Sequence, residues 1–336
     1  MLFFVLVVAL GVEISERWSN LPNGLGIPAL TPLDRARLSE LPRAFTNSEM
    51  IDLPKAFDAR KKWPGCIGPV LDQGTCGSCW AVSAVSVMSD RLCIEKRDVK
   101  GDANATFKLF SSLQAVACDK GPFEPGGNKG CQGGQPYAAM DYAEKKGGLV
   151  PDACFPYLKS DGGSIDTCAD EPCLKFQKTP RCPKSLFHPS PACTDGSGDW
   201  KHEANVLAKG AYIVQLSNRM AMDILTYGPI TASMGVYQDF LNYTSGVYRQ
   251  GSDVAVGAHA VKIIGWGVDG AQGGYWLVQN SWTERWGEAG YFRIAMAFGD
   301  DDPCECNICN LGVGGMFFGN HTDLVHTSSP SMPALT

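Results

Sequence analysis

The distribution of cysteine is the feature that most restricts how this chain can fold. Fourteen cysteines are scattered between Cys66 and Cys309 rather than grouped in the pairs that hold metal ions. So many thiols are typical of a protein that folds in an oxidising compartment, where they are joined as disulfides. We therefore expect a disulfide-stapled protein that enters the secretory pathway.

The start of the chain also favours export. Residues 2–10 are apolar but too few to span a bilayer, and small residues such as Gly11 supply a suitable cleavage site. We interpret residues 1–11 as a cleaved signal peptide; because the usual basic residues in front of it are missing, a start further upstream and a weak anchor stay open. Later in the sequence no run of about 18 apolar residues occurs, so we expect no stable membrane anchor after signal cleavage. Three N-glycosylation sequons agree with a secretory route, at Asn104, Asn242 and Asn320.

The composition is that of a globular protein. Hydrophobic residues make up 44% of the 336 residues and charged residues only 19%, which is enough apolar material for one large core or two lobes. The net charge is -6 and no run of Lys or Arg occurs, so the chain lacks the positive surface that a phosphate backbone requires. We expect no nucleic-acid partner.

Three segments differ in composition from the rest of the chain. Residues 12–52 contain several prolines and no cysteine, and are interpreted either as a flexible N-terminal tail or as a short propeptide. Residues 157–201 show little periodicity, and a loop of this length is usually functional or stapled. Residues 319–336 are rich in Ser, Pro and Thr and are predicted to be a disordered tail. Residues 53–318 form the predicted folded domain.

Hydrophobic periodicity predicts helices in the first half of this domain and strands in the second. A helix is expected from Cys79 to Leu92, directly after a glycine-containing segment, and two more are expected at residues 136–146 and 219–227. Short segments rich in β-branched and aromatic residues predict strands at residues 230–236, 259–266, 275–279 and 291–294. The pattern therefore predicts an α+β fold.

Cys79 is the strongest candidate for a reactive residue. A cysteine attacks as the thiolate, and the helix N-terminus at which Cys79 is predicted to lie lowers the pKa of a thiol. Two other interpretations stay open at this point. Cys76 and Cys79 also form a Cys-x-x-Cys pair of the redox type, and both could be structural half-cystines.

Three further residues could complete a catalytic centre around this cysteine. His259 begins a predicted apolar strand, where a histidine is more often a core residue, but Asn280 follows the next predicted strand. An Asn oxygen can accept a hydrogen bond from an imidazole and fix its tautomer, while the nearby indole of Trp282 keeps water away. The side-chain amide of Gln73 could join the backbone N–H of Cys79 in stabilising an oxyanion.

The segments that carry these residues resemble the papain family of cysteine proteases, and within it cathepsin B. The resemblance extends from Leu53 to about Gly315 and includes Cys76-Gly-Ser-Cys79-Trp80, the local signature around the family's nucleophile. Other matching motifs are Trp63-Pro-Gly-Cys66, Ser89-Asp-Arg-Leu-Cys-Ile94, Cys131-Gln-Gly-Gly134 and Asp239-Phe-Leu-Asn-Tyr-Thr-Ser-Gly-Val-Tyr248. His259 and Asn280 follow Cys79 by about 180 and about 200 residues, more than the roughly 130 to 150 of the family. The excess requires an insertion, for which residues 157–201 have the right size.

The resemblance implies a papain-like two-lobed fold, with a helical left lobe, a β-barrel-like right lobe and the active-site cleft between them. It implies an endopeptidase in which Cys79 forms a thioester with the substrate while His259 transfers the proton. Asn280 would orient the imidazole and Gln73 would stabilise the oxyanion. No metal or cofactor takes part in this chemistry. The residues that the resemblance places in the substrate-binding cleft are Gly133, Gly134, Gln135, Pro136, Ser233, Ala260, Trp282 and Leu311.

The same resemblance implies five disulfides: Cys66 with Cys93, Cys76 with Cys131, Cys118 with Cys182, Cys154 with Cys193, and Cys168 with Cys173. Besides Cys79, three cysteines then remain: Cys304, Cys306 and Cys309. Cysteines at this spacing can bind zinc, but because no fourth ligand is close we expect one disulfide and one spare thiol.

Two departures from cathepsin B concern specificity. Cathepsin B carries a histidine pair in its occluding loop that binds the C-terminal carboxylate of a substrate. Here the crown of that loop contains Asp170 and Glu171 instead, which repel a carboxylate. We therefore expect weak or absent dipeptidyl carboxypeptidase activity. Leu311 aligns with the acidic residue that accepts Arg in the S2 pocket of cathepsin B, so we expect a preference for apolar P2 residues.

The competing hypothesis is a secreted, disulfide-rich binding protein that keeps the fold without catalysis. Such relatives usually lose the nucleophile, the base or the orienting amide, and all three are present here. The expected partners are peptide or protein substrates and inhibitors of the cystatin or propeptide type, and we expect a monomer. The expected location is a lysosome-like or vacuolar compartment or the extracellular space.

Overall fold

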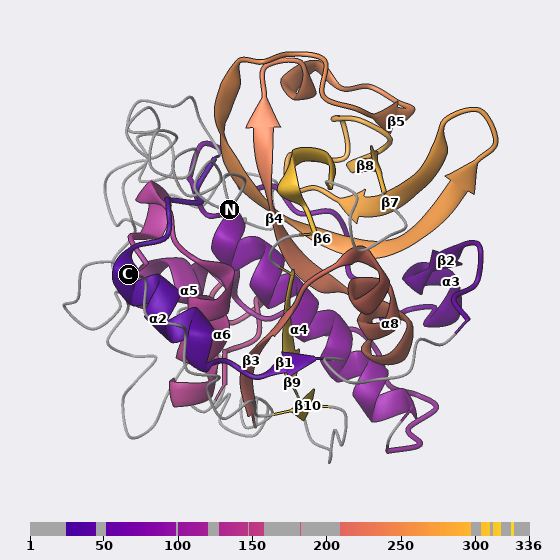
Figure 1. Cartoon of the computed structure of the whole chain (residues 1–336). Helices are drawn as coiled ribbons and strands as arrows, with labels where there is room; N and C mark the ends of the chain where they lie inside the picture. The colour runs from indigo at the N-terminus through magenta and orange to yellow at the C-terminus, as the bar shows by residue number, and fades with distance from the viewer. Residues whose placement is uncertain are drawn as a thin grey trace, which may run out of the picture.

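The computed structural model shows a helical part packed against a sheet (Figure 1). The structure describes residues 25–44, 52–98, 100–119, 128–146, 148–157, 182, 209–296, 304–309, 312–316 and 324–325. The helices are α2 (Pro32–Glu40), α3 (Ala59–Lys62), α4 (Cys79–Asp98), α5 (Ser112–Cys118), α6 (Pro136–Lys146) and α8 (Ser217–Tyr227). The strands are β1 (Arg43–Ala44), β2 (Phe57–Asp58), β3 (Lys209–Val214), β4 (Ile230–Tyr237), β5 (Val247–Tyr248), β6 (Ala255–Asp269), β7 (Gly273–Gln279), β8 (Tyr291–Ala295), β9 (Gly312–Met316) and β10 (Leu324–Val325). Short 3₁₀ segments lie at Gly130–Gln132, Phe240–Asn242 and Glu305–Asn307.

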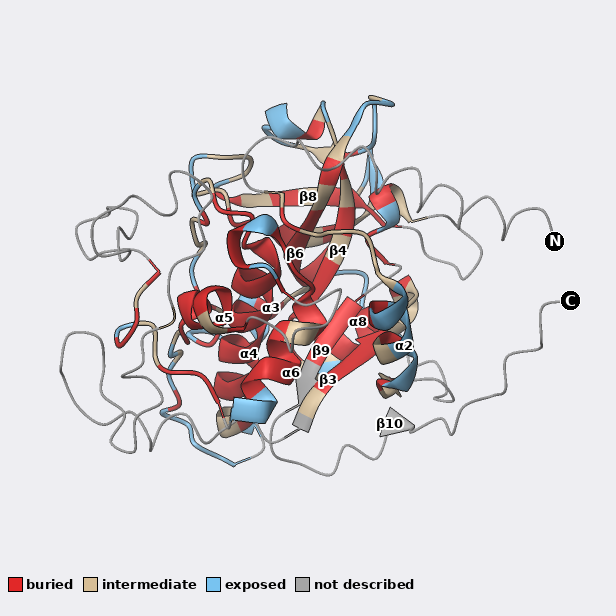
Figure 2. Ribbon diagram, turned by 90° about the vertical axis from the view of Figure 1, so that its left-hand side faces the viewer, coloured by how far each residue is buried: buried red, intermediate tan, exposed pale blue. Residues whose placement is uncertain are grey.

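Helix α4 is the buried centre of the helical part. Its residues from Cys79 to Glu95 are all buried, and α5, α6 and strand β6 pack around it (Figure 2). Many of these residues are Ala, Val and Ser, whose small side chains let neighbouring elements approach closely. The indole of Trp80 is fully buried and donates to the carbonyl of Gly130 at 3.1 Å. The first turn of α4 is therefore held in place from within the fold.

The strands form one mixed sheet in the order β10-β1-β3-β9-β4-β6-β7-β8-β5. The long strand β6 pairs antiparallel with β4 on one side and with β7 on the other. In this register Met234 of β4 lies opposite His259, and Gln279 at the end of β7 lies opposite Lys262. Asn280 therefore leaves the sheet beside the part of β6 that carries His259.

A buried ion pair joins α4 to the sheet. Lys262 of β6 is only 2% exposed, and its ammonium group lies 2.7 Å from a carboxylate oxygen of Asp90 and 2.7 Å from the hydroxyl of Ser86. Both partners belong to α4. The contact fixes the helix that begins with Cys79 relative to the strand that carries His259.

Residues 25–44 of the predicted leader are folded against the domain. Helix α2 begins with a capping box, in which the side chains of Thr31 and Asp34 bond to each other's backbone N–H groups. Asp34 also accepts a hydrogen bond from the hydroxyl of Tyr137, and Arg37 forms an ion pair with Asp141 at 2.9 Å. Both partners lie on α6, so α2 is attached to α6 by its polar side chains while its outer face is exposed (Figure 2).

Strand β1 attaches the leader to the sheet. It pairs in parallel with β3 on one side, and on the other side Arg43 and Ala44 lie opposite Val325 and Leu324 of β10. We expected residues 319–336 to be a disordered tail, but Leu324 and Val325 form strand β10. The physical reason is that β1 offers a second edge with free backbone groups to which an extended segment can pair.

The predicted elements are present, with differences at their ends. The three predicted helices correspond to α4, α6 and α8, and the four predicted strands correspond to β4, β6, β7 and β8. The prediction that a strand begins at His259 was wrong, because β6 begins at Ala255 and pairs with β4 along that extra length. The predicted α+β fold class is confirmed.

Three of the implied disulfides lie within the described residues: Cys66–Cys93, Cys76–Cys131 and Cys118–Cys182. Cys154 is also disulfide-bonded, whereas its expected partner Cys193 lies outside the described residues. The expected pair Cys168 and Cys173 lies outside them as well. Each confirmed pair has one half-cystine in α4 or α5 or in the loop before α4, so these bonds tie the helical part together.

The last three cysteines are joined as expected. Cys304 and Cys309 form a disulfide and Cys306 is a buried free thiol. Within the described part of the chain no group of three or more His, Cys, Asp or Glu side chains could hold a metal ion. In the same part, no helix combines the length and the apolar character that crossing a bilayer requires.

Candidate active site

The thiol of Cys79 lies at the first residue of α4. Its side chain is fully buried, and it is hydrogen-bonded to backbone groups of Ala260 and Gly26. Burial raises the pKa of the Cys79 thiol to about 11, although these hydrogen bonds act in the opposite direction. In this state the thiol is protonated at neutral pH.

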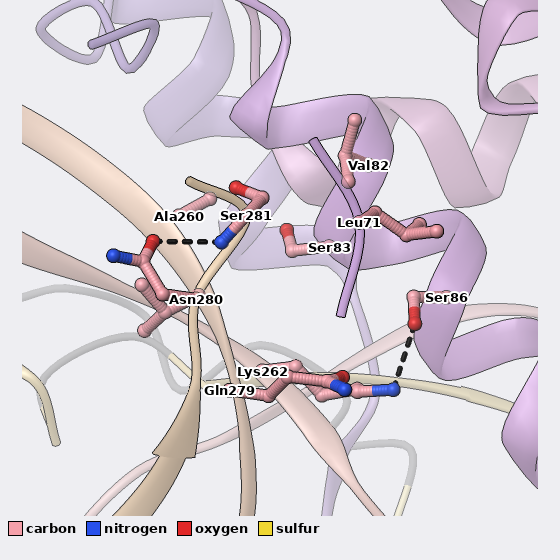
Figure 3. Close-up of a pocket in the computed structure, with 10 residues that line it drawn as sticks. Leu71, Val82, Ser83, Ser86, Ala260, Lys262, Gln279, Asn280 and Ser281 are labelled. Atoms are coloured by element: carbon pink, nitrogen blue, oxygen red, sulfur yellow. Dashed lines mark hydrogen bonds between the residues drawn. The ribbon is translucent and has the colours of Figure 1, made fainter. Parts of the chain in front are cut away.

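His259 and Asn280 are in direct contact. Atom Nε2 of His259 lies 2.8 Å from Oδ1 of Asn280. The same oxygen accepts from the backbone N–H of Ser281 at 2.8 Å (Figure 3). Because an amide oxygen only accepts, Nε2 carries the proton and Nδ1 carries the lone pair. Among the described residues, Nδ1 has no hydrogen-bond partner. The basic atom of the imidazole is therefore free.

The surroundings of His259 keep it neutral. Burial lowers the pKa of the imidazole to about 4, while the hydrogen bond to Asn280 raises it. The indole of Trp282 stacks on the imidazole with ring centroids 4.7 Å apart, and Trp286 packs edge-on against Trp282 at 5.1 Å. This aromatic cover excludes water, which strengthens the hydrogen bond between His259 and Asn280.

Gln73 reaches the site from the loop before α4. Its backbone N–H donates to the carbonyl of Ser281 at 3.0 Å, and the hydroxyl of Ser281 donates to its side-chain oxygen at 2.6 Å. The side-chain nitrogen donates to the carbonyl of Cys76 at 3.0 Å. The amide is thus held near the N-terminus of α4, where the sequence analysis placed an oxyanion donor.

The interface between α4 and the sheet is closely packed behind these residues. A cavity of about 10 Å³ lies there, lined among others by Ser83, Lys262 and Asn280 (Figure 3). This volume is close to the minimum that a single water molecule needs. The backbone that carries Asn280 therefore has little room to shift relative to α4.

Leader residues 25–30 cross the site. The carbonyl of Gly26 accepts a hydrogen bond from the backbone N–H of Gly134 at 2.9 Å, so the leader contacts the glycine that we predicted for substrate. A side chain at Gly26 is excluded, because its Cβ would lie 1.9 Å from the carbonyl oxygen of Gly77. A Cβ on Gly134 would lie 2.3 Å from a side-chain oxygen of Asn128. The backbone of the loop before α4 therefore requires glycine at position 26, and the side chain of Asn128 requires glycine at position 134.

Neighbouring leader residues contact both parts of the fold. The N–H of Ile27 donates to the carbonyl of Ala258 at 3.4 Å, and the carbonyl of Pro28 accepts from the side chain of Gln135 at 2.8 Å. Ile27 packs against the apolar cluster around α4, whereas Leu25 packs against the apolar cluster of the sheet. The leader thus lies between the helical part and the sheet and covers the thiol.

Most of the residues predicted to bind substrate can be located: Gly133, Gly134, Gln135, Pro136, Ser233, Ala260 and Trp282. Ser233 and Ala260 lie opposite each other in the pairing of β4 with β6. Ala260 follows His259 and touches the thiol through its backbone. Leu311 lies outside the described residues.

Three residues that shape the site were not predicted from the sequence: Gly26, Ala258 and Ser281. Ala258 contributes a carbonyl group, which any residue type carries, so its role leaves no trace in the sequence. Ser281 contributes a hydroxyl beside a residue that was already singled out. Gly26 lies between two apolar residues, which is a weak signal of a close contact, but nothing in the sequence indicates which surface it meets.

The fold and the arrangement of thiol, imidazole and amide are those of a thiol protease. The sequence model of the papain family cysteine proteases matches residues 53–314, and the chain belongs to this family. Similar sequences agree with this assignment. The chain is 38% identical over 283 residues to a cathepsin B-like cysteine proteinase of Schistosoma japonicum, covering 79% of this chain and 74% of the relative. It is 37% identical over 279 residues to cathepsin B-like cysteine proteinase 5 of Caenorhabditis elegans, with the same coverage of 79% and 74%.

Solved structures agree with this assignment. The chain is similar to proCathepsin B S9 from Trypanosoma congolense, with a TM-score of 0.65, 29% sequence identity, and coverage of 89% of this chain and 87% of that one. It is also similar to the bromelain protease from Ananas comosus in complex with the E64 inhibitor, with a TM-score of 0.56, 26% identity, and coverage of 78% and 99%. The chain is therefore a papain-family cysteine protease of the cathepsin B-like type.

Proposed function

We propose that the chain is a cysteine endopeptidase in which Cys79, His259 and Asn280 carry out catalysis. The observation that carries this proposal is the hydrogen bond between Nε2 of His259 and Oδ1 of Asn280, because it leaves Nδ1 as a free base. The next residue on the same strand, Ala260, contacts the thiol of Cys79 through its backbone. This contact supports the pairing of a base on the sheet with a nucleophile on α4.

The reaction follows from this geometry. Atom Nδ1 of His259 takes the thiol proton while the sulfur of Cys79 attacks the carbonyl carbon of the scissile bond. The backbone N–H of Cys79 and the side-chain amide of Gln73 stabilise the oxyanion of the tetrahedral intermediate. The C–N bond then breaks, the leaving amine takes the proton from the imidazole, and a thioester remains on the sulfur. Water, deprotonated by the imidazole, hydrolyses the thioester and restores the thiol.

The leader, residues 12–52, acts as an inhibitory propeptide in this proposal. The position of residues 25–30 supports this role, because a chain bound to Gly134 and lying over the thiol blocks the substrate. The pKa values of the covered groups support it too, since burial keeps the thiol protonated and the imidazole neutral. Removing the leader exposes both groups to water, which lowers the pKa of the thiol and raises that of the imidazole. Loss of the leader therefore favours the reactive thiolate.

Two features of the sequence support an endopeptidase with an apolar P2 preference. The acidic residues Asp170 and Glu171 in the occluding-loop-like segment repel a substrate's C-terminal carboxylate, so removal of dipeptides is weak or absent. No acidic residue occurs from residue 306 to residue 315, where Leu311 aligns with the bottom of the S2 pocket. An Arg side chain at P2 would therefore be buried without a partner.

The partners and location follow the same proposal. The substrates are peptides or proteins, and the propeptide and inhibitors of the cystatin type compete with them for the cleft. The enzyme works as a monomer in a lysosome-like or vacuolar compartment or outside the cell. The exposed side chains of Asn104 and Asn242 are accessible for glycosylation on the secretory route.

Hydrolysis of two fluorogenic dipeptidyl substrates tests the proposal. The form cleaved near Leu53 is assayed with Phe-Arg and with Arg-Arg at P2-P1, and Cys79→Ala serves as the control. Thiol-dependent cleavage of Phe-Arg but hardly of Arg-Arg, lost in the variant, is expected. Equal cleavage of both substrates would agree with the protease activity but contradict the proposed apolar P2 preference. No cleavage of either substrate would contradict the proposed activity.

A further inference from the structure

A second hollow adjoins the active site, and none of the described leader residues 25–44 lines it. It has a volume of about 230 Å³ and is lined by Asp72, Gly74, Leu241, Trp282 and Trp286. Trp282 is the indole that stacks on His259, so the hollow begins at the catalytic imidazole.

The position of the hollow indicates which side of the scissile bond it serves. The leader passes the thiol on the side of Gly134 and Gln135, which is the side that we assign to the acyl part of the substrate. The hollow lies beside the loop before α4, where Asp72 pairs with Trp282. A peptide with its acyl part on Gly134 and its carbonyl at Cys79 therefore directs its leaving-group part toward this hollow.

The hollow combines apolar walls with one carboxylate. The side chain of Leu241 and the ring of Trp286 form the walls, and the indole N–H of Trp286 donates to the carbonyl of Leu241 at 3.3 Å. One oxygen of Asp72 accepts from the backbone N–H of Gly74 at 2.8 Å. In the part of the chain that the structure describes, its other oxygen has no hydrogen-bond partner, and Asp72 is the one charged residue in the lining. Such a hollow suits a Lys or Arg side chain, because the carboxylate of Asp72 can accept hydrogen bonds from the cationic group while the indole rings pack against the apolar stem.

We propose that this hollow binds a Lys or Arg side chain of the substrate, located within the first three residues after the scissile bond, and that Asp72 determines this preference. The inference rests on the proposed endopeptidase activity. The stem of the side chain packs on Leu241 and Trp286 while its charge faces the carboxylate. Because Asp72 is only half-buried, the ion pair and the cation–π contact together should favour the basic residue by about three- to tenfold in kcat/KM.

The test uses internally quenched peptides and the full chain activated by cleavage near Leu53. The reference peptide has Ala at the three positions after the scissile bond, and three further peptides place a single Arg at each position in turn. Asp72→Asn is the decisive variant, since an amide oxygen can still accept from Gly74 while the charge is removed. The matched control is Asp102→Asn, because the exposed Asp102 accepts from the N–H two residues further on, at 3.0 Å, in the same way.

The expected result is that Arg at one of the three positions raises kcat/KM about three- to tenfold over Ala. This ratio should fall to about one in Asp72→Asn, remain in Asp102→Asn, and decrease in high salt, which screens the ion pair. If the reference peptide is cleaved but no Arg position is favoured, or if Asp72→Asn keeps the ratio, this inference is overturned and the proposed activity stands. If none of the peptides, the reference included, is cleaved, the proposed activity itself is overturned.

Discussion

Replacing Gly26 by Ala should release the leader from the active site. The added Cβ would lie 1.9 Å from the carbonyl oxygen of Gly77 and 2.4 Å from its carbonyl carbon. Both are backbone atoms of the loop before α4, so they cannot turn aside as a side chain does. The leader would have to leave the cleft and lose its hydrogen bonds to Gly134, Ala258 and Gln135. At about 0.5–1.5 kcal/mol each, the three bonds amount to roughly 1.5–4.5 kcal/mol, which opens the site roughly tenfold to a thousandfold more often.

The assay is the rate at which an epoxide-type inhibitor labels Cys79 in the intact precursor. Gly26→Ala should label roughly tenfold to a thousandfold faster than the unaltered precursor, up to the rate of the form cleaved near Leu53. Leu33→Ala is the control, because Leu33 belongs to the same leader but is 44% exposed on α2. If Gly26→Ala is labelled no faster than this control, then the contact between Gly26 and Gly77 does not hold the leader over the thiol.

Three further perturbations test other parts of the argument. The rate at which iodoacetamide alkylates Cys79 in the precursor should increase toward pH 11, since burial raises the pKa of this thiol to about 11. Cleavage near Leu53 should move this pH–rate profile to lower pH, and identical profiles for the two forms would refute the role of burial. Lys262→Met leaves the carboxylate of Asp90 buried without its cation, so the free energy of unfolding, measured with denaturant, should fall by about 3–5 kcal/mol, and a loss below 1 kcal/mol would contradict the buried ion pair. A precursor truncated after Gly319 lacks β10, whereas one truncated after Thr327 keeps it. The epoxide should label Cys79 about two- to tenfold faster in the shorter precursor, because β1 of the leader has lost its pairing with β10. Equal labelling rates would show that β10 does not hold the leader.

The secondary structure that surrounds the site was predictable because it depends on local patterns. The helix from Cys79 follows a glycine-containing loop and is free of Gly and Pro, and strands such as β7 are short, β-branched and aromatic. The leader helix α2 was not predicted, although Thr31, Pro32 and Asp34 form an N-terminal capping signal. Its stability comes from contacts with α6 that are distant in sequence, such as the ion pair between Arg37 and Asp141.

The side chains of the candidate site were predictable for a different reason. Cys79, His259 and Asn280 carry chemistry that few residue types provide, and their local motifs are distinctive. The contacts that assemble them are less visible, because Ala258, Ala260 and Gly134 act through backbone groups that every residue type possesses. Asp72 escaped notice for a related reason: a single aspartate next to Gln73 becomes significant only when the fold places Trp286 and Leu241 around it.

The contact between the leader and Gly134 explains how a protease can carry a peptide across its own active site without cutting it. The carbonyl of Gly26 in the leader accepts a hydrogen bond from the backbone N–H of Gly134 at 2.9 Å. It is therefore bonded to the substrate-binding glycine and not to an oxyanion donor. The side-chain amide of Gln73, the proposed donor, gives one of its two N–H groups to the carbonyl of Cys76 at 3.0 Å, which holds the amide in place. Burial meanwhile disfavours both the thiolate and the imidazolium, because neither charge is solvated under the leader. In the proposed precursor the leader therefore resists cleavage on two counts, since the carbonyl of Gly26 is bonded to Gly134 and the charged form of the nucleophile is disfavoured.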